Sequence, residues 1–203
     1  MLTIGIELNH VVRDINKQII KYYDKAYDKG WDLDEMDTNE NVYKYISFNS
    51  KKENNNFFFI DYPYEIYGCA ETCERSLAVK INNWLVDLKE IEDEDVRVVF
   101  YTMNEDNIAL QSTYFFLSKI GARVRKMIFP ESINEVWDEC DIIVTANGDF
   151  LEGNVPQGKK VVLINKPFNS NVKEKAYANY DSLSEFIEDN NFLTNVLSDE
   201  NKQ

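Results

Sequence analysis

Short apolar runs that alternate with helix-spaced segments constrain the fold of this chain more than any other feature of its sequence. The apolar runs suit buried strands, and the segments between them repeat apolar residues at intervals of three and four, which predicts helices. Such an alternation predicts an α/β fold, with a Rossmann-like parallel sheet, right-handed crossovers and helices on both faces. We expect strands at residues 2–8, 96–102, 124–129, 141–145 and 160–165, and helices at 15–27, 70–90, 107–119, 133–137 and 182–189.

Polar residues stand where three of the expected strands end. Glu7 and Asn9 end the first, Thr102 ends the second, and Thr145 and Asn147 end the fourth. In open parallel sheets, ligands bind beyond the carboxyl ends of the strands. We therefore expect a functional site where these residues meet.

The first strand and its turn resemble the opening motif of the haloacid dehalogenase (HAD) superfamily of phosphatases. The sequence Ile-Gly-Ile-Glu-Leu-Asn-His at residues 4–10 is similar to the strand and Asp-x-Asp-Gly turn of that family. The resemblance places Glu7 at the position of the family's nucleophile and Asn9 at the position of its general acid/base. Both aspartates are missing, so the resemblance implies the fold without its chemistry.

Each replaced residue weakens the expected catalysis for a physical reason. Glu7 can bind Mg²⁺, but its extra methylene displaces the carboxylate, and a displacement of about an ångström can cost about 10²-fold in rate. The Asn9 amide cannot donate and accept a proton near neutral pH. His10 replaces the motif's glycine, which suggests that close backbone approach to a phosphate is no longer required. His10 is either a substitute acid or a packing residue.

The resemblance also suggests phosphate-binding residues. Thr102 ends an apolar strand, as the family's phosphate-binding threonine does, although a strand-end threonine with no such role fits equally well. Lys119 is placed better than Lys126 as the family's lysine, and a surface lysine is the alternative.

The metal-binding acids of the family are the least well matched. The expected strand at residues 141–145 leads to Asn147, and Asp149 follows two residues later. Glu7 and Asp149 would make a thin site for Mg²⁺, which needs several well-placed oxygen ligands. We therefore expect no cofactor, or Mg²⁺ if the protein is active.

A second match lies far along the chain and in the order that the family requires. Residues 161–169, Val-Val-Leu-Ile-Asn-Lys-Pro-Phe-Asn, are similar to a strand and Pro-Tyr-Asn segment of the 5′(3′)-deoxyribonucleotidase branch. The resemblance thus covers about residues 2–190. It implies a HAD-like core at residues 1–30 and 91–197 and a small helical cap insert at 31–90, before a polar tail at 198–203.

Composition restricts the partners. The net charge of −14 repels a phosphate backbone, so we expect no extended nucleic-acid binding. No apolar run approaches the ~20 residues of a membrane span, and no signal peptide is recognised, so we expect a cytoplasmic protein with no membrane partner. Abundant Asn, Lys, Ile and Tyr are typical of AT-rich genomes, such as that of a phage or a low-GC bacterium, and a phage source would also allow a location in the virion.

Three functions remain open. The preferred one is a catalytically inactive HAD-like protein that serves as a structural or binding component. One context for such a component is a phage ring, neck or tail assembly, with other subunits contacting an apolar patch around residues 57–60. The alternatives are a Mg²⁺-dependent nucleotide phosphatase with an altered site, and a sensor that binds nucleotide without hydrolysis through Thr102, Lys119 and the strand-end amides.

Overall fold

The computed structural model describes residues 1–33, 35–36, 42–90, 96–103 and 107–200. It contains a six-stranded sheet of order β5-β4-β1-β6-β7-β8, in which every neighbouring pair is parallel. The predicted α/β, Rossmann-like architecture is therefore confirmed. The strands are β1 (Leu2–Glu7), β4 (Val96–Tyr101), β5 (Met127–Ile128), β6 (Ile142–Thr145), β7 (Lys160–Ile164) and β8 (Ala178–Tyr180).

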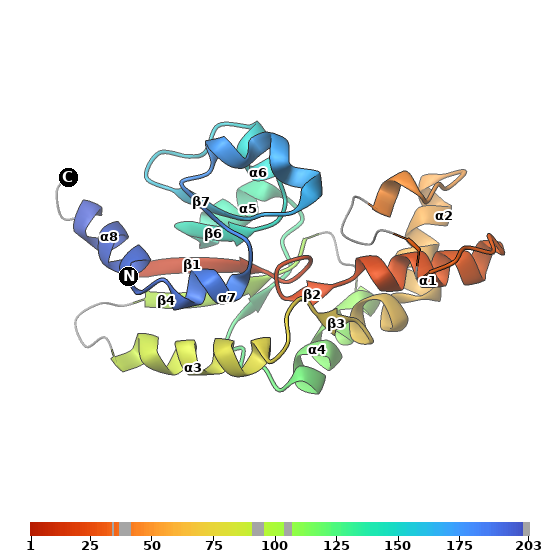
Figure 1. Cartoon of the computed structure of the whole chain (residues 1–203), viewed down its shortest axis with the longest axis horizontal. Helices are drawn as coiled ribbons and strands as arrows, with labels where there is room; N and C mark the ends of the chain where they lie inside the picture. The colour runs from red at the N-terminus through yellow and green to blue at the C-terminus, as the bar shows by residue number, and fades with distance from the viewer. Residues whose placement is uncertain (34, 37–41, 91–95, 104–106, 201–203) are drawn as a thin grey trace.

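Helices cover both faces of this sheet. A helical arm, made of α1 and the described residues 42–76, extends beyond the carboxyl end of β1 (Figure 1). The helices are α1 (Asn16–Tyr27), α2 (Lys51–Asn56), α3 (Leu77–Glu90), α4 (Asn107–Ile120), α5 (Ile133–Glu139), α6 (Asp149–Glu152), α7 (Leu183–Glu188) and α8 (Asn190–Glu200). Shorter helical turns are η1 (Val42–Lys44), η2 (Phe57–Asp61), η3 (Tyr64–Gly68) and η4 (Pro167–Lys175), and a small second sheet pairs β2 (Arg13–Asp14) with β3 (Glu71–Thr72).

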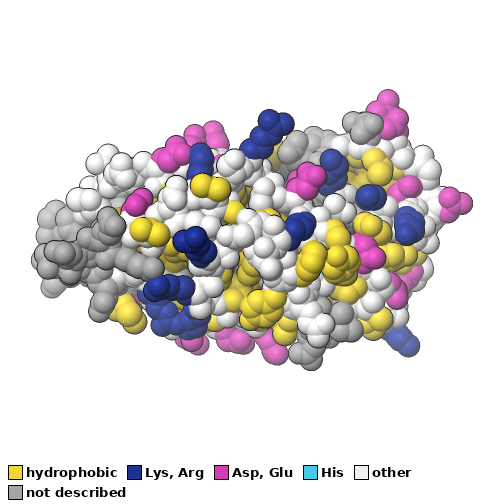
Figure 2. All heavy atoms as spheres, turned by 90° about the horizontal axis from the view of Figure 1, so that it is seen from below, with side chains coloured by type: hydrophobic (Ala, Val, Ile, Leu, Met, Phe, Trp, Pro, Cys, Tyr) yellow, Lys and Arg dark blue, Asp and Glu magenta, His cyan; other side chains and the backbone are white. Residues whose placement is uncertain are grey.

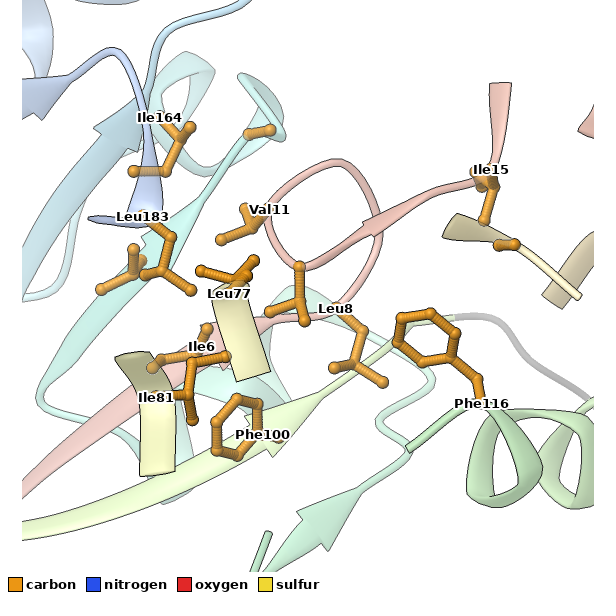
Figure 3. Packing of buried hydrophobic residues seen from close by; sticks show 14 of the residues in the cluster. Ile6, Leu8, Val11, Ile15, Leu77, Ile81, Phe100, Phe116, Ile164 and Leu183 are labelled. Atoms are coloured by element: carbon orange, nitrogen blue, oxygen red, sulfur yellow. The ribbon is translucent and has the colours of Figure 1, made fainter. Parts of the chain in front are cut away.

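Side chains alternate across the sheet and divide the core into two clusters. On β7, Val161 and Leu163 pack with residues of α5 and α6, whereas Val162 and Ile164 face the opposite side. On that opposite side they belong to the cluster that contains Leu77 of α3 and residues of α7 (Figure 3). A strand buried on both faces is apolar at consecutive positions, which is why the sequence marks these strands as continuous runs.

Gly5 in the middle of β1 allows α5 to pack closely against the sheet. A Cβ atom built on Gly5 would lie 2.6 Å from the Sγ atom of Cys140, the residue that follows α5. That separation is far shorter than a van der Waals contact, so any larger residue would push the sheet and Cys140 apart.

Three short helices begin with the same local device. Ser50, Ser132 and Ser182 each precede a helix, and each hydroxyl accepts a hydrogen bond from the backbone N–H of a glutamate three residues later. This arrangement satisfies an N–H group that has no partner within the helix, and it explains where α2, α5 and α7 begin.

The strand expected at residues 124–129 is shorter than predicted. Only Met127 and Ile128 of the expected range pair with β4, and the Lys126 carbonyl before them accepts a hydrogen bond from the Phe100 N–H at 3.0 Å. The Asn82 side chain of α3 accepts a hydrogen bond from the Arg123 backbone N–H at 2.7 Å and donates one to the Gly121 carbonyl at 2.9 Å. These two contacts hold the residues just before the expected strand against α3.

The helix predicted from residue 70 begins only at Leu77. Glu71 and Thr72 pair with β2 in the second sheet, because the turn after β1 brings residues 13–14 alongside them. The rest of this helix packs on the core sheet: the Trp84 ring lies 5.9 Å from the Phe186 ring of α7. Of the expected insert at 31–90, α3 therefore lies against the sheet, and the described residues 42–76 form the arm with α1.

One further expectation is corrected. The Phe57 and Phe58 rings of the apolar run at 57–60 are buried among the aromatic residues of the arm, so they do not offer a contact surface. Only Ile60 is well exposed, at 60%. Part of the expected polar tail is helical, since α8 continues to Glu200. Residues 201–203 lie outside the described residues.

Candidate functional site

A cavity of about 340 Å³ lies at the carboxyl ends of the central strands, where ligands bind in open parallel sheets. It brings together Glu7, Asn9 and Asp149, three of the residues predicted from the sequence. Thr102 and Lys119 are not among the residues that line it. The described lining residues are Glu7, Asn9, His10, Ile15, Asn16, Val42, Tyr43, Met103, Ala146, Asn147, Asp149 and Phe168.

Glu7 ends β1 with its carboxylate directed at the end of β6. Its Oε2 atom accepts a hydrogen bond from the Thr145 hydroxyl at 2.5 Å and another from the Ala146 backbone N–H at 3.1 Å. Burial raises the pKa of Glu7 from 4.5 to about 7, although both hydrogen bonds favour the charged form and oppose this rise. Glu7 therefore joins the ends of β1 and β6, and one of its carboxylate oxygens already accepts two hydrogen bonds.

Asn9, which was expected at an acid/base position, is held between two other side chains. Its amide nitrogen donates to the Thr102 hydroxyl at 3.1 Å. Its amide oxygen accepts from two nitrogens of the Arg13 guanidinium, Nε at 3.0 Å and Nη2 at 2.6 Å. These contacts fix the orientation of the amide. Thr102, the residue expected to bind phosphate, is fully buried and positions Asn9.

Arg13 is fully buried, and the sequence analysis did not identify it. Its Nη1 atom donates to the Thr113 hydroxyl at 2.7 Å and to the Tyr67 carbonyl at 3.3 Å. The guanidinium lies 5.0 Å from the centre of the Tyr67 ring and 5.5 Å from that of Phe116. A planar cation with several donors can satisfy an amide, a hydroxyl and two aromatic faces at once. The signal in the sequence was an arginine that directly follows two valines and lies four residues after Asn9.

His10 adopts a backbone conformation that favours glycine. Its φ angle is +66°, in the left-handed region, and its N–H donates to the Arg13 carbonyl at 2.8 Å. The ring packs edge-on against Phe168 at 5.4 Å. Burial, helped by the charges of Lys166 and Arg13, lowers the pKa of His10 to about 4. A neutral imidazole at pH 7 is a weak proton donor, which favours the packing role for His10.

Lys119 is directed away from the cavity. Its Nζ atom donates to the Ala70 carbonyl at 2.7 Å and lies 5.6 Å from the centre of the Phe116 ring. Lys119 therefore joins α4 to the arm, and the structure does not bring the two expected phosphate-binding residues together.

The turn after β6 is built from amide and hydroxyl contacts. The Asn147 N–H donates to the Thr145 hydroxyl, and the Asn147 side chain accepts from the Asp149 N–H, both at 2.9 Å. Asp149 is exposed at the rim of the cavity. Within the described part of the chain, no three His, Cys, Asp or Glu side chains lie close enough together to hold a metal ion.

The segment similar to the deoxyribonucleotidase branch closes one side of the cavity. Asn169 is buried, and its amide nitrogen donates to the carbonyls of Ala146 and Ile164 at 2.9 and 3.0 Å. Asn169 thereby ties the ends of β6 and β7 together. Phe168 lines the cavity, so this segment both braces the site and shapes its wall.

Comparison with protein-family models and with curated proteins gives no match. None of the helices that the structure describes is long and apolar enough to span a membrane.

Proposed function

We propose that this protein is a catalytically inactive, HAD-like binding protein, whose cavity holds a ligand without transforming it. The observation that carries this proposal is that Glu7 and Asn9, the two residues expected at reactive positions, are both hydrogen-bonded within the protein. Glu7 braces the end of β6, and Asn9 is fixed by Arg13 and Thr102. A carboxylate or an amide that is already hydrogen-bonded to other parts of the chain is poorly placed to attack phosphorus or to transfer a proton.

The lining of the cavity favours an uncharged, polar ligand. No lysine or arginine is among the described lining residues, and Asp149 contributes a negative charge at the rim. A phosphate dianion would meet repulsion here. Amide groups such as Asn147 offer hydrogen bonds, and Tyr43 and Phe168 offer aromatic faces, a combination suited to a nucleoside or a sugar.

Phosphate release tests the loss of catalysis. Wild type and the Glu7→Asp, Asn9→Asp double variant are incubated with a panel of nucleoside monophosphates, with and without Mg²⁺. We expect no release above background from either protein, because Arg13 would bind a carboxylate at position 9 and lower its pKa. Mg²⁺-dependent release by wild type that Glu7→Gln abolishes would instead establish a phosphatase with an altered site.

Thermal stabilisation tests binding. Neutral nucleosides and sugars are compared with nucleoside 5′-monophosphates, and the neutral compounds are expected to raise the melting temperature more. Tyr43→Ala is expected to reduce that rise. Tyr114→Ala is the matched control, because both tyrosines are 54% exposed and only Tyr43 lines the cavity. Equal responses of the two variants would contradict binding at this site.

A further inference from the structure

The strand β4 has an open edge along its first half. It pairs with β1 over its full length, from Val96 to Tyr101, but on its other side the described residues pair only at Phe100 and Tyr101. The Asn82 contacts keep residues 121–123 on α3, so β5 does not extend along this edge. Backbone groups at an unpaired strand edge are a template for another chain.

The direction of the backbone groups follows from the bonds at the end of the strand. The Phe100 N–H donates to the Lys126 carbonyl on the β5 side, whereas the Tyr101 carbonyl accepts from Leu8 on the β1 side. Because these directions alternate along a strand, the N–H and C=O groups of Val96 and Val98 also point toward the β5 side.

A second cavity, of about 520 Å³, lies beside this edge, between β4, α3 and residues 123–126. Its wall includes the buried Leu88 and Phe100 and the half-buried Leu85, Val96 and Val98. The wall therefore offers apolar surface next to free backbone groups, which is what an added strand with alternate apolar side chains requires.

The rim of this cavity has the opposite charge from the protein as a whole. Arg97, Arg123, Arg125 and Lys126 line it, and the described lining residues include no Asp or Glu, although the chain has 36 acidic and 22 basic residues. Lys126 pairs with Glu139, while Arg123 and Arg125 are exposed. Figure 2, which views the side on which α3 lies, shows Lys and Arg side chains beside hydrophobic ones.

We propose that this second cavity binds an extended, acidic peptide segment of a partner protein, which adds a strand to the edge of β4. The peptide backbone pairs with Val96 and Val98. Its apolar side chains pack on the wall beside α3, and its acidic side chains reach Arg123 and Arg125. Backbone pairing contributes affinity, and the basic rim selects for acidic sequences.

Fluorescence anisotropy with synthetic peptides tests the proposal. The probe is a labelled decapeptide of alternating valine and glutamate, and the comparisons are a valine–lysine decapeptide and a valine–glutamate decapeptide methylated on every backbone nitrogen. We expect binding of the first peptide only, with affinity that falls as salt is raised. Equal binding of the lysine peptide would overturn the charge argument. Equal binding of the methylated peptide would overturn strand pairing.

Charge-reversal variants locate the site. The Arg123→Glu, Arg125→Glu double variant is expected to bind the probe at least about tenfold more weakly, because two attractive contacts become repulsive. Lys173→Glu, Lys175→Glu is the matched control: it makes the same change in net charge at exposed residues of η4, and its affinity is expected to equal that of wild type. Equal losses in both variants would overturn the assignment to this cavity.

Two measurements separate this partner from other occupants. Bound probe is expected to slow hydrogen exchange at the amides of Val96 and Val98, and unchanged exchange there would overturn strand addition. Sedimentation of the protein alone is expected to give a monomer. A dimer that the Arg123→Glu, Arg125→Glu variant abolishes would mean that a second copy of this chain occupies the edge of β4. That result would overturn the proposal that a peptide of a partner protein binds there.

Discussion

Replacing Glu7 with glutamine is expected to change how the stability of the protein depends on pH. Burial raises the pKa of this carboxyl from 4.5 to about 7 in the folded protein. The folded state therefore keeps a proton between pH 4.5 and 7 that the unfolded state has lost. Since the folded state binds more protons in this window, the free energy of unfolding falls as the pH rises through it and levels off above pH 7.

The magnitude follows from the two pKa values. Each pKa unit corresponds to about 1.4 kcal/mol, so the ionisation of Glu7 costs about 3 kcal/mol of stability at pH 8 relative to pH 4.5. Glutamine keeps an oxygen that can accept from Thr145 and Ala146, and it carries no charge at any pH. Glu7→Gln is therefore expected to gain on wild type by up to about 3 kcal/mol as the pH rises from 4.5 to 8.

Urea denaturation followed by tryptophan fluorescence measures this difference at pH 4.5, 6, 7 and 8. Any cost of burying the new amide nitrogen is the same at each pH, so the change with pH is the test and not the offset. Glu152→Gln, at an exposed residue of α6, is the matched control, and its difference from wild type is expected to stay constant. A difference between Glu7→Gln and wild type that does not grow between pH 5 and 8 would refute the reasoning.

Three further changes test the packing around the site. His10→Asn is expected to be more stable relative to wild type at pH 5 than at pH 7, and urea midpoints of both proteins at the two pH values check this. The reason is that burial lowers the pKa of His10 from 6.5 to about 4, so wild type loses stability as the pH falls from 6.5 toward 4 and the variant does not. Asparagine tolerates the positive φ at this position. Gly5→Ala is expected to cost about 1–3 kcal/mol, and less in a Cys140→Ala background, which urea denaturation of the single and double variants measures. Arg13→Lys is expected to cost about 2–4 kcal/mol in the same assay, because lysine cannot bond Asn9 bidentately while also serving the Thr113 hydroxyl.

The central strands were predictable because they are buried on both faces. Each of the five predicted runs contains an observed strand, and in β1, β6 and β7 continuous apolar sequence marks a strand that packs against helices on two sides. The sixth strand, β8, was missed. It lies at the edge and its sequence, Ala-Asn-Tyr, has no apolar run to reveal it.

The candidate site was predictable in its location but not in its contacts. Strand-end residues such as Glu7 and Asn147 meet because parallel strands end at the same edge of a sheet. Arg13 and Tyr43 could not be assigned, because the turn after β1 and the arm bring them to the site from segments with no strong pattern. Lys119 was expected at the site, yet the same packing of α4 against the arm draws it to the Ala70 carbonyl.

By itself, the sequence determined the layered architecture and the edge of the sheet at which the polar residues collect, because periodicity and burial are properties of short segments. Only the tertiary structure decided what those polar residues do. Whether Glu7 is free or braced by Thr145, and whether Asn9 faces a ligand or Arg13, depends on side chains that are distant in sequence or brought together by a turn. The open edge of β4 is likewise a tertiary feature, since β5 pairs only with Phe100 and Tyr101 while Asn82 in α3 holds the Gly121 carbonyl and the Arg123 N–H.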